Sequence, residues 1–176
     1  MTNNFVVSYT YALPLQRLTT RGVMGKVLEG WQWSGITHFS TGLPVSLYEW
    51  DDHALYGDGL DIPNYKTTAI QFMNPRDTAT QQYFTTQPFS SESLEVVGDA
   101  NRRFFHGPGL NNWDCMLRKN TRITERFSTE LRIEFFNHAN HAQFNTPDGA
   151  ITDKAFGAVT SAHAPRIGQA ALKLYF

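Results

Sequence analysis

The sequence predicts an all-β protein, built as an antiparallel up-and-down meander of about five strands. Apolar and polar residues alternate with the period of a β-strand in five segments, and no apolar stripe at helical spacing is sustained. Aromatic residues make up 14% of the chain and charged residues only 18%, whereas soluble domains usually carry about 25% charged residues. The expected strands are 5–13, 31–47, 113–123, 128–136 and 166–176.

The first two expected strands each have one strongly apolar face. In the first strand this face carries Phe5, Val7, Tyr9, Tyr11 and Leu13. Pro14 ends the alternation, because proline cannot donate a hydrogen bond to a neighbouring strand. The second strand opens with Trp31 and Trp33, an arrangement that fits sugar stacking but is more typical of an aromatic girdle at a membrane interface. Gly42 and Pro44 predict a bend or bulge within this strand.

The last three expected strands combine an apolar face with a more polar one. Segment 128–136 alternates most regularly, with Leu131 and Ile133 among its apolar side chains. The charged face of the third and fourth strands carries Arg118, Arg122, Glu130, Arg132 and Glu134. At this spacing we expect these residues to pair across strands rather than to act as catalytic acids. Segment 166–176 ends on Phe176, and because chain ends usually fray in water this ring needs an apolar environment.

The connections between the expected strands alternate between long and short. Residues 48–112 form one connection, rich in Asp, Asn, Thr, Gln, Gly and Pro, that is far longer than a usual loop. A soluble β-sandwich that binds a carbohydrate or protein through this loop fits the pattern, and so does a transmembrane β-barrel. An eight-stranded barrel would need three more strands in the loop, where 71–73 and 94–97 are too short.

Composition and charge exclude several classes of protein. The net charge of −1 provides no field that would attract nucleic acid. The single cysteine, Cys115, excludes an internal disulfide and a multi-cysteine metal site. No apolar run is long enough for a membrane-spanning helix, and the first residues lack the basic and apolar regions of an export signal, so we expect no signal peptide in this chain.

Two stretches carry a specific resemblance. They are "GPGLNNWDCMLRKNTRITERFSTELRIEFFNHANHAQFNTP" at 107–147 and "FGAVTSAHAPRIGQAALKLYF" at 156–176. A GPG-x-N-N-x-D strand, a T-E-R-F turn, an R-x-E-F-F-N strand with N-H-x-x-F and a terminal aromatic strand follow in this order. The run resembles the C-terminal end of a TonB-dependent outer-membrane receptor, of the class with a carboxypeptidase-regulatory-like N-terminal domain. "VVSYTYALPL" and "LEGWQWSGITHFSTGLPVSL" extend the resemblance over most of the chain.

The resemblance implies about the last five strands of a barrel in the outer membrane of a Gram-negative bacterium. The implied partners are the remainder of the barrel and its plug, the TonB system, the barrel-assembly machinery and outer-membrane lipid. We expect this fragment not to be transport-competent alone. The charged face would line the lumen, and 48–112 and 137–165 would be extracellular. Tyr175 and Phe176 resemble the terminal signature that the assembly machinery recognises.

Candidate ligand-facing residues lie in both long connections. They are Asp51, Asp52, His53, His138 and His141. The two histidines of "NHANH" have a spacing that suits a metal, but the motif is weak, and the acidic loop around Asp51 lacks the strict pattern of a calcium loop. No serine has nucleophile-elbow surroundings. We therefore expect no metal, no cofactor and no enzymatic activity.

Overall fold

The computed structural model describes residues 2–18, 22–57, 59–66, 68–101 and 103–176. The chain divides into two compact units. The strand unit comprises Asn4–Phe39, Asn111–Ala142 and Ala164–Phe176. The loop unit comprises Met1–Asn3, Ser40–Leu110 and Gln143–His163. None of the described helices is long and apolar enough to cross a membrane.

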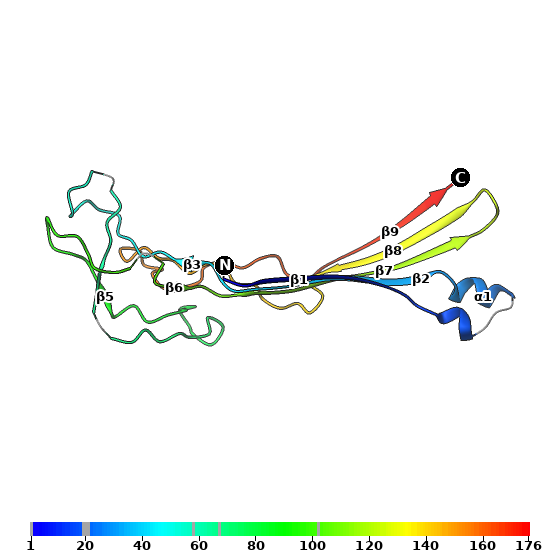
Figure 1. Cartoon of the computed structure of the whole chain (residues 1–176), viewed down its shortest axis with the longest axis horizontal. Helices are drawn as coiled ribbons and strands as arrows, with labels where there is room; N and C mark the ends of the chain where they lie inside the picture. Colours follow the sequence, from blue (N-terminus) through cyan, green and yellow to red (C-terminus); the bar gives the residue numbers. More distant parts are fainter. Residues whose placement is uncertain (1, 19–21, 58, 67, 102) are drawn as a thin grey trace. The chain divides into compact units, whose positions relative to one another are not determined.

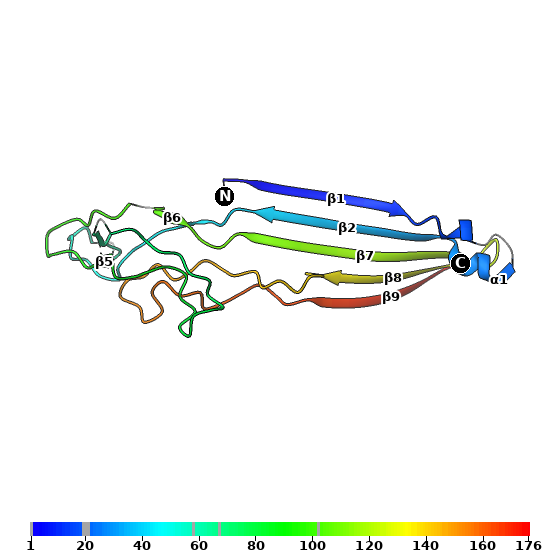
Figure 2. The same cartoon turned by 90° about the horizontal axis from the view of Figure 1, so that it is seen from below.

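The strand unit is a sheet of five strands in the spatial order β1-β2-β7-β8-β9 (Figure 1). Neighbouring strands run in opposite directions, and β1 and β9 form the two edges (Figure 2). The strands are β1 (Asn4–Ala12), β2 (Trp31–Ser40), β7 (Leu110–Arg122), β8 (Ser128–Phe136) and β9 (Ile167–Tyr175). The predicted all-β class and the five-stranded antiparallel meander are confirmed.

The register of β7, β8 and β9 keeps apolar and polar side chains on opposite faces. Ile133 of β8 lies between Leu117 of β7 and Ala170 of β9. On the other face, Glu130 lies opposite Asn120. Because successive side chains of a strand point to opposite faces, a slip of one residue would exchange the two sets.

The apolar face of the sheet is exposed. The side chains of β9 include Leu172 and Leu174, which are 65% and 67% exposed. Toward β1, the ring of Phe39 lies 6.5 Å from the ring of Phe5 and 6.4 Å from that of Trp113. A contiguous apolar surface of this kind indicates contact with a membrane or with another protein surface.

Two glycines allow aromatic rings to lie across the strands. A Cβ atom at Gly35 of β2 would stand 2.5 Å from the Oη of Tyr9. A Cβ atom at Gly168 of β9 would stand 3.0 Å from Cε1 of Phe135. Any larger residue at Gly35 would displace the tyrosine ring, so glycine is needed there for the close approach.

A short helical segment, which the alternation pattern did not predict, lies between β1 and β2. It consists of the 3₁₀ turn η1 (Leu15–Leu18) and the helix α1 (Gly22–Leu28). Seven residues are too few for a helix to be stable in isolation. The Nζ of Lys119 donates hydrogen bonds of 2.9 Å to the carbonyl oxygens of Lys26 and Glu29. A cation at the C-terminal end of a helix stabilises it, so contact with β7 supports α1.

The second strand ends earlier than the predicted range of 31–47. At Gly42 the backbone passes so close to Gly107 that a Cβ atom would collide with the carbonyl oxygen of Gly107. The chain has left the five-stranded sheet here, and β3 (Pro44–Val45) pairs with β6 (Phe105–His106) in the loop unit. The predicted bend therefore separates two sheets.

Residues 48–112, expected as one long solvated loop, help to build a hydrophobic core. β4 (Asn64–Tyr65) pairs with β5 (Phe89–Ser90), and β7 already begins at Leu110. The buried core side chains are Val45, Leu47, Phe84, Phe89 and Phe105. Phe84 is fully buried, and its ring lies 4.7 Å from the ring of Phe105. Aromatic residues spread over the sequence thus meet in one cluster, which gives this region a fixed structure.

The register makes a testable prediction about Cys115. Phe135→Cys places a second thiol directly opposite Cys115, where Cβ atoms are about 4.5–5.5 Å apart and within modest adjustment of disulfide geometry. Mild oxidation of the full chain in detergent should form this disulfide, detected by mass spectrometry of the cross-linked peptides. Leu131→Cys, which lies opposite Lys119, is the matched control and should not cross-link to Cys115. Cross-linking in the control alone would contradict the register.

Candidate functional site

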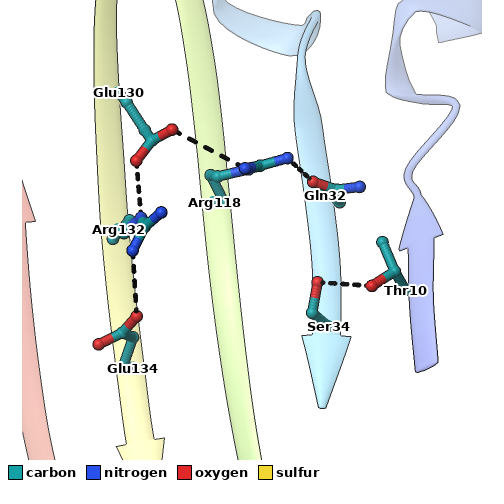
Figure 3. A network of polar contacts seen from close by, with 7 residues as sticks. All are labelled: Thr10, Gln32, Ser34, Arg118, Glu130, Arg132 and Glu134. Carbon is teal, nitrogen blue, oxygen red and sulfur yellow. Dashed lines mark hydrogen bonds and ion pairs between the residues drawn. The ribbon is translucent and has the colours of Figure 1, made fainter. Parts of the chain in front are cut away.

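A network of polar side chains runs along one face of the strand unit (Figure 3). The carboxylate of Glu130, which is 7% exposed, accepts a hydrogen bond of 2.6 Å from Nε of Arg132 and lies 3.8 Å from Nη1 of Arg118. Arg132 also lies 3.9 Å from a carboxylate oxygen of Glu134. Arg118 donates a hydrogen bond to Gln32 of β2. Two arginines therefore balance two glutamates over neighbouring strands.

Further contacts extend this polar face to both edges of the sheet. Thr10 of β1 donates a hydrogen bond of 3.2 Å to Ser34 of β2 (Figure 3). At the other edge, Gln169 of β9 donates a hydrogen bond to Glu134. The alternation in the sequence places these residues on one face, and the register brings them into contact.

Four of the five residues predicted to share the charged face belong to this network, and Arg122 does not. Its Nε donates a hydrogen bond of 3.4 Å to the carbonyl oxygen of Thr124 in the β7–β8 turn. Arg122 lies opposite Ser128, at the last register position of the pair. The charge pattern of the sequence does not indicate Gln32 and Gln169 as members, because their amides are neutral.

A second candidate site is a group of buried acidic side chains in the loop unit. Glu49 and Asp61 form an antiparallel bridge, with backbone hydrogen bonds of 2.9 and 3.2 Å in the two directions. Residues paired in this way direct their side chains to the same side. Glu49 is 0% exposed and Asp61 is 2% exposed.

His53 adds an imidazole to two further carboxylates of this unit. Its Nδ1 lies 3.5 Å from Oδ2 of Asp51 and 3.8 Å from Oε1 of Glu92. Burial raises the pKa of Glu49 to about 7, and the carboxylates of Glu92 and Asp51 act in the same direction, while the Ser91 hydroxyl opposes the shift. The carboxylate cluster is defined here as Glu49, Asp51, His53, Asp61 and Glu92.

The structure changes the interpretation of the acidic loop. Asp51 and His53, expected in a solvated loop, belong to the carboxylate cluster together with the buried Glu92. Asp52 does not join it, because its Oδ1 accepts a hydrogen bond of 2.8 Å from the backbone N–H of Gly57. No sequence pattern indicates Glu49, Asp61 and Glu92, since these residues meet only through the tertiary pairing of distant segments.

The two histidines of "NHANH" are positioned by the turn that follows β8. The backbone N–H of His138 donates a hydrogen bond of 2.7 Å to the carbonyl of Trp113. The backbone N–H and C=O of His141 both bond to the Asn137 side chain, at 3.0 and 2.9 Å. Asn137 and Asn140 have φ angles of 49° and 50°, a conformation that asparagine tolerates well. The structure thus gives this segment a turn-forming role.

The predicted terminal signature lies at an edge of the sheet. Tyr175 is the last residue of β9 and lies opposite Ser128 of β8. Phe176 follows it and is 96% exposed. No element among the described residues covers this ring. The apolar environment that it needs would therefore have to come from outside the described residues.

A comparison with protein families identifies the architecture. A family model described as an outer membrane beta barrel domain matches residues 1–169. The chain belongs to this family. No curated protein and no solved structure matches it. The family assignment favours the barrel over the soluble sandwich and identifies the chain as an outer-membrane β-barrel protein.

Membership in the barrel family explains the contrast between the two faces of the sheet. In such barrels, apolar side chains on one face of each strand contact lipid, and the alternate side chains point to a polar interior. The exposed leucines of β9 and the arginine and glutamate network lie on opposite faces of the sheet, as this arrangement requires. The outer-membrane barrel domain thus gives both sets a suitable environment.

Glu130 is expected to be the most sensitive position of the polar network. Glu130→Gln keeps the size of the side chain but removes the charge that pairs with Arg118 and Arg132. We expect a loss of roughly 2 kcal/mol in the free energy of unfolding, measured by urea unfolding of the full chain in detergent. Glu125→Gln in the exposed turn is the matched control and should change stability little. Equal effects of the two variants would contradict the structural role of the network.

Proposed function

We propose that the chain forms the C-terminal part of the barrel of a TonB-dependent receptor, which takes up a ligand through the outer membrane. The observation that carries the proposal is the receptor-like order of motifs over 107–147 together with the contacts that its residues make. Oδ1 of Asp114 accepts hydrogen bonds from Asn112 Nδ2 and from the backbone N–H of Asn137, at 2.9 and 2.8 Å. Three polar residues of the motif run are thus joined at one position, where β8 ends beside β7.

The side chain of Asn137 extends this connection to the last strand. It donates hydrogen bonds to the carbonyl oxygens of His141 and Ala164, and the backbone N–H of Arg166 bonds to Asn140. Asn137 is 6% exposed. A motif that ties three successive strands together in this way suits the rim of a barrel, where strands must pass into ligand-facing loops.

The edges of the sheet support the proposed partners. β1 and β9 present backbone groups that lack a neighbouring strand among the described residues, and hydrocarbon cannot satisfy such groups. We therefore propose that further barrel strands pair with these edges and that a plug fills the interior. The TonB system would supply energy, and the barrel-assembly machinery would recognise Tyr175 and Phe176.

Each part of the chain has a distinct role in this proposal. The apolar face contacts outer-membrane lipid, the polar network lines the interior, and the loop unit faces the ligand. The chain acts in transport and not as an enzyme, because the paired charges of the strand unit balance each other in structural contacts. Nucleic acid is not a proposed partner, since the net charge is −1.

Purification of the native assembly tests the receptor proposal. An affinity tag inserted between the exposed residues Asp153 and Lys154 allows isolation from detergent-solubilised outer membranes of the host. We expect the tagged barrel to include a plug and to bind the purified periplasmic domain of TonB. An assembly that binds no TonB would contradict energy-dependent uptake and leave the barrel assignment intact. A monodisperse monomer in buffer without detergent would favour a soluble binding module instead.

The orientation of the two sheet faces makes a second prediction. Leu172→Arg places a charge on the lipid-contacting face and should cost roughly 2–4 kcal/mol if the residue lies near the bilayer centre. Gln169→Arg, in the same strand, places the same charge opposite Glu134 and should change the free energy of unfolding little. Both are measured by urea unfolding of the assembled barrel in phospholipid bilayers. Tolerance of Leu172→Arg together with loss of stability in Gln169→Arg would reverse the assignment of the faces.

A further inference from the structure

The carboxylate cluster of the loop unit has the arrangement of a metal site. The three atoms His53 Nδ1, an Asp51 carboxylate oxygen and a Glu92 carboxylate oxygen lie within 4.8 Å of one another. The nitrogen is 3.5 Å from the Asp51 oxygen and 3.8 Å from the Glu92 oxygen. Tetrahedral ligands at ordinary zinc distances are about 3.3 Å apart. Small side-chain movements would therefore bring all three atoms onto one ion.

The cluster also contains buried polar atoms that lack partners. Glu49 is 0% exposed, and neither of its carboxylate oxygens has a hydrogen-bond partner among the described residues. The same is true of both oxygens of Glu92, which is 5% exposed, and of Nδ1 of His53. Buried carboxylates that lack hydrogen bonds are costly, so this group suits a ligand that accepts electron pairs from several atoms at once.

The charge of the cluster selects a cation. The carboxylates of Glu49, Asp51 and Glu92 face only one imidazole, and no lysine or arginine in the described part of the chain forms an ion pair with them. The carboxylates of Asp51 and Glu92 therefore repel each other across the cluster. A divalent cation would relieve this repulsion, whereas an anion would increase it.

We propose that the loop unit binds one Zn²⁺-like divalent ion through Asp51, His53 and Glu92, with Glu49 as the adjoining carboxylate. The imidazole ligand favours Zn²⁺ over Ca²⁺, because Ca²⁺ prefers six to eight oxygen ligands. The side chain of His53 is 45% exposed, so the ion keeps one side open to solvent. This site does not depend on the identity of the receptor ligand.

Zinc titration of the full chain tests the proposal directly. The chain is stripped with a chelator in detergent and titrated with ZnCl₂, CaCl₂ or MgCl₂ by calorimetry. Tryptophan fluorescence gives a second signal, to which Trp50 contributes from its position between Glu49 and Asp51 in the sequence. We expect one Zn²⁺ per chain, with an affinity at least about tenfold above that for Ca²⁺ or Mg²⁺.

Matched variants separate the cluster from other zinc-binding side chains. His53→Ala and Glu92→Gln should each weaken zinc binding by at least about tenfold. His163→Ala and Asp153→Asn change an exposed histidine and an exposed aspartate outside the cluster. Both variants should leave the affinity for zinc within about twofold of the unmodified chain. Absence of saturable zinc binding, or equal effects of cluster and control variants, would overturn the proposal.

A stability readout covers the case in which a variant misfolds. Zn²⁺ should slow proteolysis of the loop unit in the unmodified chain, and CaCl₂ at the same concentration should not. In the metal-free chain, Glu92→Gln should be at least as resistant as the unmodified sequence, because it removes one repelling charge. If Glu92→Gln is more resistant but Zn²⁺ protects neither protein, the carboxylates share a proton instead of a metal, and the proposal fails.

Discussion

The cross-strand register of the five-stranded sheet is the constraint on which the rest of the strand unit depends. Because side chains alternate between the two faces, the pairing of Ile133 with Leu117 also places Arg118 of β7 beside Glu130 of β8 in the polar network. Slippage by one residue would bring charged groups to the apolar face and leucines to the polar face. The separation of an apolar surface from a polar surface is therefore a property of the register as much as of the composition.

The polar network gives this sheet a second source of specificity. A barrel wall gains little from apolar contact between its own strands, since lipid provides an equally apolar neighbour. Charge pairs on the other face can be satisfied only in one alignment, and the contacts of Glu130 with Arg118 and Arg132 join two strands. Network and register thus support each other and help to exclude other alignments of strands with similar patterns.

The loop unit is stabilised differently, by a hydrophobic core of its own. Phe84 and its aromatic neighbours form a compact core of the kind seen in water-soluble domains, and β3 to β6 contribute only short pairings. Such a core holds the backbone firmly enough to bury Glu49 and Glu92. Burial of unpaired acids lowers stability. The proposed ion would offset this loss of stability and would fix the geometry of the loop that carries Asp51 and His53.

The sequence by itself determined the strand class, the number of long strands and the residues of each face, because a period of two is a local property of the chain. It did not predict α1, whose carbonyl groups are stabilised by Lys119 from a distant strand. Nor did it predict the carboxylate cluster, since Glu49, Asp61 and Glu92 follow no common spacing. Tertiary structure decided these features, because they depend on which distant segments the aromatic core and the short strand pairs bring together.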